Sequence, residues 1–290
     1  MEQTAVIYDW FGYALPLRER YRLIRAAGFD GVMLWWSNDF GRGDAGRDNY
    51  REAVGLARSE GLHIENIHAP VAPQHALWEE GEAGEAAMDC YRSCMEDCAA
   101  YGIPTMVIHL PGCHRVPGAV AEERVAELAA CAERLGVNVA VENLGNAENV
   151  AFVLSRTSSP RVGFCYDCCH HWNHEPEVDY LVRYGQRLLA LHMHDNGGPR
   201  RQHQLPFDGQ IDWAEVMRSL SAAGYAGPLA LEPMNWDYTR MSPDEFLRTA
   251  YDRVCRLCAL NETKKEETEK GTKKTTKMHR NRQECVIMER

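Results

Sequence analysis

The chain alternates short apolar runs with longer amphipathic segments over most of its length. The apolar runs cover residues 4–10, 31–36, 63–69, 105–110, 138–144, 161–167, 188–195 and 228–234. Between them, apolar residues recur at helical spacing, as in LRERYRLIRAAG and AMDCYRSCMEDCAAYG. Some of these segments end at a glycine just before the next run, such as Gly28 and Gly102, as helix C-caps do. The pattern predicts apolar strands that alternate with helices, and hence a parallel sheet buried on both faces.

The number and spacing of these units predict one barrel. Eight strand–helix units in about 260 residues are typical of a (β/α)₈ TIM barrel, an α/β fold that forms a single domain at this length. We therefore expect a catalytic domain over residues 1–260. A doubly wound open sheet is the structural alternative, but no GxGxxG motif follows the first apolar run.

Residues 261–290 differ from the rest of the chain in composition. They are rich in Lys, Thr and Glu and cannot bury enough apolar surface to offset the entropy of ordering, so we expect a disordered, low-complexity tail. The tail has nine basic and six acidic residues, whereas residues 1–260 have 23 basic and 36 acidic ones. This acidic body disfavours nucleic acid as a partner.

The cysteines indicate a reducing compartment. The chain has 11 of them, an odd number, and its first residues lack the basic and apolar segments of a signal peptide. No apolar run approaches the roughly 20 residues that span a bilayer, so we expect a cytoplasmic protein without a membrane partner. Cys90, Cys94 and Cys98 recur every four residues and predict one buried stripe on a helix.

Ionisable side chains follow most of the predicted strands, at the end where TIM barrels carry their active sites. These side chains belong to His68, His109, Glu142, Asp167, His170, His192, His194 and Glu232. Burying so many carboxylates and imidazoles on one rim is costly without a cation. The simplest ligand set takes one residue from each of the last four strands: Glu142, Asp167, His192 and Glu232. This mixture suits one divalent ion such as Mn, Mg, Co or Zn.

The sequence also resembles a known family, the xylose isomerase-like TIM barrels, which include sugar phosphate isomerases/epimerases and endonuclease IV. The matching stretches are AAGFDGVMLWW, IENIHAP, VIHLPG, VAVENLG, YDCCH, LHMHDN, HQLPFDGQIDW and GPLALEP. The resemblance implies the same four metal ligands, with Glu142 and Glu232 also exchanging the substrate proton as the catalytic pair. The family pattern His-x-x-Asp selects His192 over His194 as the ligand and leaves His194 beside the site or the substrate.

The resemblance further implies a set of substrate-binding residues. His68 and His109 match the two early histidines of the family, while His170 and His203 match histidines that hold substrate oxygens. Arg201 could meet a phosphate or carboxylate. Among Trp10, Phe11, Trp35 and Trp36, which are candidates for an apolar wall, we expect Trp10 and Trp36 to lie nearest the substrate.

The resulting hypothesis is a metal-dependent isomerase or epimerase of a sugar, sugar phosphate or inosose, which moves a proton next to a carbonyl through a metal-stabilised enediolate. An inosose dehydratase-like lyase is an alternative that uses the same groups. An endonuclease IV-like zinc phosphodiesterase on abasic DNA is disfavoured, because Arg201 stands where that enzyme has a ligand Asp. The sequence leaves open whether the site binds a second metal ion and whether the protein forms a homo-oligomer. In CYDCCHHW, Cys165, Cys168 and Cys169 are expected to pack around Asp167 and His170 rather than to bind zinc.

Overall fold

A computed structural model describes residues 4–37, 50–112, 117–198 and 202–260. It contains eight parallel strands: β1 (Ala5–Tyr8), β2 (Gly31–Trp35), β3 (His63–His68), β4 (Thr105–His109), β5 (Asn138–Glu142), β6 (Val162–Asp167), β7 (Leu188–His192) and β8 (Leu229–Leu231). They lie in the order β7-β6-β5-β4-β3-β2-β1-β8. A parallel bridge between Met193 and Leu231 joins the two ends of this order, so the sheet closes into a barrel.

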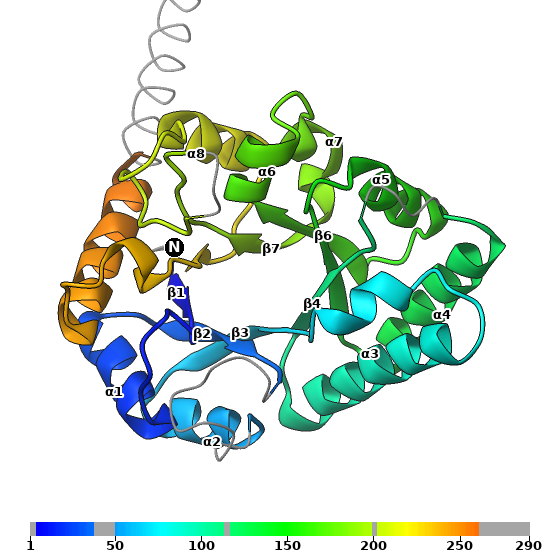
Figure 1. The fold of residues 1–290 in the computed structure, drawn as a ribbon, viewed down its shortest axis with the longest axis horizontal. Helices are drawn as coiled ribbons and strands as arrows, with labels where there is room; N and C mark the ends of the chain where they lie inside the picture. The colour runs from blue at the N-terminus through cyan, green and yellow to red at the C-terminus, as the bar shows by residue number, and fades with distance from the viewer. Residues whose placement is uncertain (1–3, 38–49, 113–116, 199–201, 261–290) are drawn as a thin grey trace, which may run out of the picture.

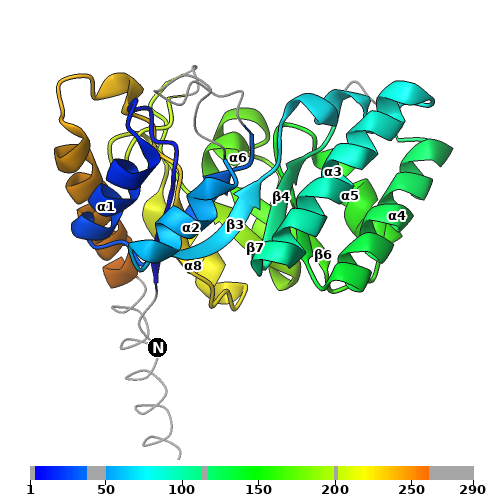
Figure 2. The same ribbon diagram turned by 90° about the horizontal axis from the view of Figure 1, so that it is seen from below.

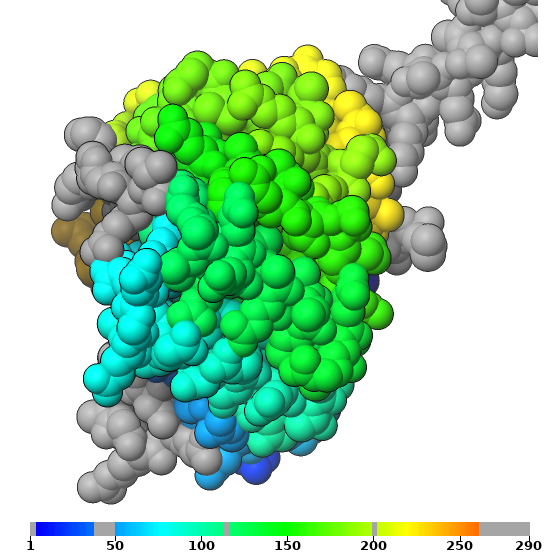
Figure 3. Space-filling model, turned by 90° about the vertical axis from the view of Figure 1, so that its right-hand side faces the viewer, coloured from blue at the N-terminus to red at the C-terminus, as the bar shows by residue number. Residues whose placement is uncertain are grey.

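Helices surround the barrel as an outer ring (Figure 1). They are α1 (Leu17–Ala27), α2 (Glu52–Ser59), α3 (Glu82–Tyr101), α4 (Ala119–Leu135), α5 (Ala147–Arg156), α6 (Cys168–His174), α7 (Tyr180–Tyr184), α8 (Trp213–Ala222) and a helix over residues 243–260. Short 3₁₀ turns are η1 (Ala72–Ala76), η2 (Gly185–Arg187) and η3 (Asn235–Asp237). On the side formed by α3, α4 and α5, the helices cover the strands completely (Figure 3).

The strands are buried on both faces because the helices cover one side and the opposite strands cover the other. The inner face carries small side chains in its lower layer: Val107, Ala140, Cys165 and Ala190 pack together with almost no exposure. Each of them lies two residues before a polar residue at the end of the same strand, namely His109, Glu142, Asp167 and His192. Since alternate residues of a strand face the same side, the polar residues form the next layer up inside the barrel.

The predicted barrel is confirmed, and the open-sheet alternative is excluded by the closure between Met193 and Leu231. The strands begin and end within about two residues of most predicted runs, and Gly28 and Gly102 end their helices with positive φ angles, as expected. The predicted tail, residues 261–290, lies outside the described residues. Among the described residues, no helix is long and apolar enough to cross a membrane.

The carboxyl ends of the strands lie at one end of the barrel, where α6 and the long loops also lie (Figure 2).

Substitution of Gly163 tests how tightly the sheet is packed where β6 meets β7. A Cβ atom at this position would overlap the carbonyl oxygen of Arg187 and the side chain of Leu189. We expect Gly163→Ala to lower the free energy of unfolding by about 1–3 kcal/mol, as overpacked cores do. Gly55, in the exposed face of α2, has open space around it, so Gly55→Ala should instead raise stability by about 0.5–1 kcal/mol. Urea unfolding of both variants measures the difference, and equal stabilities would contradict the described packing.

Candidate metal centre and active site

Strand pairing sets the height of the site residues on the rim. His109 of β4 pairs with Glu142 of β5, and Asp167 of β6 pairs with His192 of β7. His68 is the last residue of β3, and Glu232 follows β8 directly. The parallel register therefore brings the strand ends together at one level of the barrel, as the sequence predicted.

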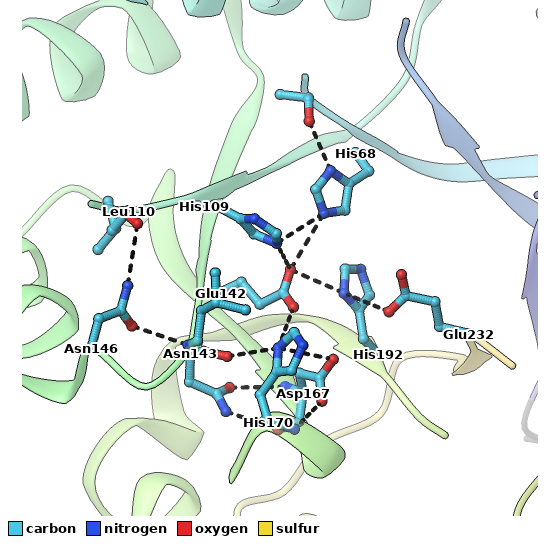
Figure 4. A network of polar contacts seen from close by, with 12 residues as sticks. His68, His109, Leu110, Glu142, Asn143, Asn146, Asp167, His170, His192 and Glu232 are labelled. Atoms are coloured by element: carbon cyan, nitrogen blue, oxygen red, sulfur yellow. Dashed lines mark hydrogen bonds and ion pairs between the residues drawn. The ribbon is translucent and has the colours of Figure 1, made fainter. Parts of the chain in front are cut away.

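Glu142 is the centre of this arrangement (Figure 4). Its Oε2 atom lies 3.2 Å from Nε2 of His109, 3.6 Å from Nε2 of His68 and 3.1 Å from Nδ1 of His192. Its Oε1 atom lies 3.0 Å from Nδ1 of His170. The carboxylate is only 1% exposed, so four imidazoles converge on one buried anion.

Hydrogen bonds define which ring nitrogens face the centre. Nδ1–H of His68 donates to the carbonyl oxygen of Ala69 at 2.8 Å, and its Nε2 atom lies 3.2 Å from Nε2 of His109. Nδ1 of His170 has only oxygen neighbours, among them the carbonyl of Asn143 at 3.1 Å, so it carries a proton. Its Nε2 atom has no hydrogen-bond partner among the described residues. His170 thus presents a ring nitrogen inside the site that has no hydrogen bond to the described residues.

Asp167 is held rigidly at the start of α6. Its Oδ1 accepts a hydrogen bond from the backbone N–H of His170 at 2.7 Å, which is a helix N-cap, and its Oδ2 lies 3.1 Å from Nε2 of His194. The side-chain amide of Asn143 binds the backbone of Asp167 on both sides, donating to its carbonyl and accepting from its N–H. These contacts fix the carboxylate and leave oxygen lone pairs that point into the barrel.

His192 supplies the observation that favours a cation. Its Nδ1 atom lies 3.1 Å from a carboxylate oxygen of Glu142 and 3.3 Å from one of Glu232, yet neither contact has hydrogen-bond geometry and Nδ1 has no other partner among the described residues. Asp167, His192 and Glu232 offer ligand atoms that all lie within 4.8 Å of one another, as do Glu142, Asp167 and His170. A buried cluster in which Nδ1 of His192 has no hydrogen-bond partner among the described residues fits a divalent ion bound by Glu142, Asp167, His192 and Glu232.

The ionisable groups strongly shift one another's pKa values. Burial by itself raises the pKa of Glu142, but the neighbouring His192 and His109 hold it well below its ordinary value. Asp167 is also buried, and His170 and His194 lower its pKa. Burial lowers the pKa of His109 to about 4. Both carboxylates are therefore ionised at neutral pH, as metal ligands and proton acceptors must be.

A stack of two rings extends the site toward the surface. His194 and His203 lie parallel, with ring centroids 3.9 Å apart, and both are buried. His203 has a φ of 45°, an uncommon conformation that two contacts stabilise: its carbonyl accepts from Met234 N–H at 2.7 Å, and its Nδ1–H donates to the carbonyl of Glu232 at 3.1 Å. His203 is thereby tied to the residue that carries the Glu232 carboxylate.

The aromatic wall differs from the sequence expectation. Trp36 points away from the rim: its indole N–H donates to Asp97 of α3 at 3.0 Å, and its ring contacts Tyr50 and Tyr101. Trp35 instead packs against His68, with centroids 5.1 Å apart. Trp36 alternates with Trp35 along the chain, so one inward ring requires the other to face the helices. All positions of β2 are buried, which is why the sequence did not show which ring faces inward.

The remaining candidates are placed as follows. Trp10 is buried and lies under the guanidinium of Arg20, 5.3 Å from the ring centroid. Arg201 lies outside the described residues. His171, for which the sequence suggested no role, has its Nδ1 atom 2.8 Å from the hydroxyl of Tyr166 and serves packing. The hydrogen bonds of Asn143 to the backbone of Asp167 were not predicted from the sequence.

The cysteines near the site are buried packing residues, as predicted. Cys165, Cys168 and Cys169 are almost fully buried, and burial raises the pKa of the Cys165 thiol to about 12. In the helix α3 stripe, Cys94 and Cys98 are buried and Cys90 is half-buried. Cys165 packs in the lower layer of the barrel, and its thiol also lies where it could hold an ion together with Glu142 and His192, since one ligand atom of each lies within 4.8 Å of the others.

Comparison with known proteins places this fold and site in one class. The family model described as xylose isomerase-like TIM barrel matches residues 21–258, so the chain belongs to this family. It is 31% identical to the uncharacterized protein y4fM of Sinorhizobium fredii (strain NBRC 101917 / NGR234), over 89% of this chain and 94% of that protein. It is 25% identical to fructoselysine 3-epimerase of Escherichia coli O157:H7, over 75% of this chain and 86% of that enzyme.

Among solved structures, the fold is similar to the IolI protein with a bound zinc atom. The TM-score is 0.72 at 15% identity, and the match covers 88% of this chain and 98% of the IolI chain. At this identity the likeness establishes the shared barrel.

His194 provides a test of the support around Asp167. His194→Leu keeps a similar volume but removes the ring nitrogen that lies beside Asp167 Oδ2. We expect the dissociation constant for Mn²⁺ to rise by about 10–100-fold, as when other outer partners of metal ligands are lost. Calorimetric titration measures it. His63→Leu, at the opposite end of the barrel, is the matched control, and an equal effect of both substitutions would contradict the role of His194.

Proposed function

We propose that the protein is a divalent-metal-dependent sugar isomerase or epimerase that moves a proton at a carbon next to a carbonyl. One observation carries this proposal: the carboxylates of Glu142 and Glu232 lie on either side of Nδ1 of His192, at 3.1 and 3.3 Å. Two buried carboxylates that share a centre can serve the same substrate carbon from two directions.

The ligands proposed for the ion are Glu142, Asp167, His192 and Glu232. When bound, a divalent ion such as Mn²⁺, Mg²⁺, Co²⁺ or Zn²⁺ supplies positive charge that polarises a carbonyl and the hydroxyl on the neighbouring carbon. This makes the C–H bond of that neighbouring carbon more acidic. The ion offsets two of the three negative charges of the carboxylates, and the imidazole adds a neutral ligand.

The chain itself moves the proton. Either glutamate could accept the proton from the carbon next to the carbonyl. Glu142 is suited to this role because its neighbours lower its pKa and keep it ionised. The other glutamate, which enters the step carrying a proton, returns that proton to the opposite face of that carbon in an epimerase, or to the adjacent carbon in an isomerase. The two glutamates thereby exchange protonation states in the step. Both carboxylates lie in a closed rim, with Glu142 at 1% and Glu232 at 8% exposure, so bulk water does not compete for the proton.

The histidines around the glutamates are suited to hold sugar oxygens. Nε2 of His170 has no hydrogen-bond partner among the described residues, and Nε2 of His68 pairs with Nε2 of His109 at 3.2 Å beside Glu142. His109 contacts the carboxylate of Glu142, and His203 contacts the backbone carbonyl of Glu232. In this proposal Arg201 meets a phosphate or carboxylate of the substrate. The name of one relative, fructoselysine 3-epimerase, and the zinc atom of the IolI structure support sugar chemistry at a metal site.

Two alternatives use the same residues. A dehydratase-like lyase on an inosose needs the same ion and the same proton acceptor and differs only in the group that leaves. A phosphodiesterase would need further ions, and His68, His109 and Glu142 form a group that could hold one. It also needs a basic surface to bind DNA, whereas residues 1–260 have 36 acidic against 23 basic residues. Elemental analysis separates the phosphodiesterase from the isomerase and the lyase, because the last two need one ion per chain and the phosphodiesterase needs more.

Glu142→Gln tests the proposed base. We expect the rate of deuterium incorporation from D₂O into a ketose, at the carbon next to its carbonyl, to fall by about 100-fold or more, because the amide cannot accept the proton. NMR follows the exchange, and elemental analysis checks that the variant still binds metal. Glu65→Gln, a carboxylate near the start of β3, is the control. Equal exchange by the wild type and Glu142→Gln, both metal-loaded, would overturn the assignment of the base.

A further inference from the structure

Trp236 is a large apolar side chain that the fold leaves exposed beside the site. Among the described residues, the exposed large hydrophobics are Trp236, at 49%, and Val182, at 78%. Val182 lies in α7 on the outer ring of helices, whereas Trp236 lies in η3, four residues after Glu232. The Trp236 ring contacts His203 edge to face, with centroids 5.2 Å apart.

A continuous series of contacts links this indole to the proposed reaction centre. His203 stacks on His194 with centroids 3.9 Å apart, and Nε2 of His194 lies 3.1 Å from Oδ2 of Asp167. Trp236 is therefore separated from a proposed metal ligand by two rings. The indole therefore lies at the outer end of a row of rings that begins at Asp167.

The indole is held in place by a fixed backbone. The N–H of Asn235 donates to the carbonyl of Phe11 at 3.2 Å, and the N–H of Met234 donates to the carbonyl of His203 at 2.7 Å. Asn235 packs so closely on Gly12, whose φ is 92°, that a Cβ atom at Gly12 would overlap its side chain. A preorganised aromatic surface loses little entropy when a ligand packs on it.

The floor of the barrel determines the direction in which a substrate can extend. Beneath the site residues, Val107, Ala140, Cys165 and Ala190 are packed together and at most 1% exposed. Because these four side chains fill the barrel beneath the described site residues of β4 to β7, a substituent beyond the reacting carbons has room only toward the loops. Trp236 is in that direction.

We propose that Trp236 binds an apolar substituent carried by a terminal carbon of the substrate, and hence that the protein acts on substituted ketoses rather than on free ones. This inference rests on the proposed function, which supplies the ketose. An indole face buries apolar groups well and also attracts the C–H bonds next to them.

The test compares D-fructose with 1-deoxy-1-(benzylamino)-D-fructose and 6-O-benzyl-D-fructose. Their dissociation constants are measured by calorimetry on the metal-loaded, full-length chain. We expect one benzylated sugar to bind the wild type about tenfold more tightly than D-fructose, or about 1.4 kcal/mol. Trp236→Ala should abolish this preference, and Trp236→Phe should retain part of it. Val182→Ala, the matched exposed apolar control, should keep the full preference.

The inference is overturned if the wild type shows no preference for either benzylated sugar, or if Trp236→Ala retains the preference. Deuterium exchange on the same sugars reports separately on the proposed function. A Trp236-dependent preference without any exchange supports the binding surface and contradicts the proposed reaction. Exchange without a preference supports the reaction and contradicts the binding surface.

Discussion

The structure depends on one electrostatic constraint, the convergence of buried carboxylates and imidazoles at the top of a closed barrel. Glu142 alone has four imidazoles within 3.6 Å. Removing such charges from water costs several kcal/mol for each ion unless they are paired. Imidazole nitrogens with lone pairs do not neutralise three carboxylates. A divalent cation offsets two of their three negative charges, which is why the pattern of partners points to a metal centre.

The barrel meets this constraint through its strand register. Parallel pairing places His109 level with Glu142 and Asp167 level with His192. Small residues two positions earlier fill the space underneath, so the polar residues have a rigid apolar floor. Outside the ligands, Asn143 and His194 orient Asp167, and the carbonyl of Glu232 orients His203. The site is thus preorganised by backbone and side-chain contacts that come from several strands.

The sequence was sufficient to predict the barrel and the residues that gather on its rim. Eight apolar runs buried on both faces specify parallel strands, and an acid or histidine at the end of such a strand must lie at the rim. Family resemblance added the roles of these residues. The orientation of β2 was not predictable in this way, because every residue of the strand is buried and a shift of one position exchanges Trp35 with Trp36.

Contacts between loops could not be predicted from the sequence either. Trp236 follows Glu232 by four residues, and this proximity was the available signal, but its packing on His203 depends on the turn of η3. The stack of His194 on His203 depends on the left-handed backbone of His203, which no sequence motif marks. These interactions join Asp167 and Glu232 to the exposed ring of Trp236.

The central claim is that Glu142, Asp167, His192 and Glu232 bind one divalent ion. X-ray absorption spectroscopy of the Co²⁺-loaded chain tests it most directly, because the spectrum reports the atoms bound to the ion. The account predicts a first shell of oxygen and nitrogen only, with a single imidazole, and the loss of this spectrum in Asp167→Ala. A sulfur ligand from Cys165, three or more imidazoles, or an unchanged spectrum in Asp167→Ala would contradict it.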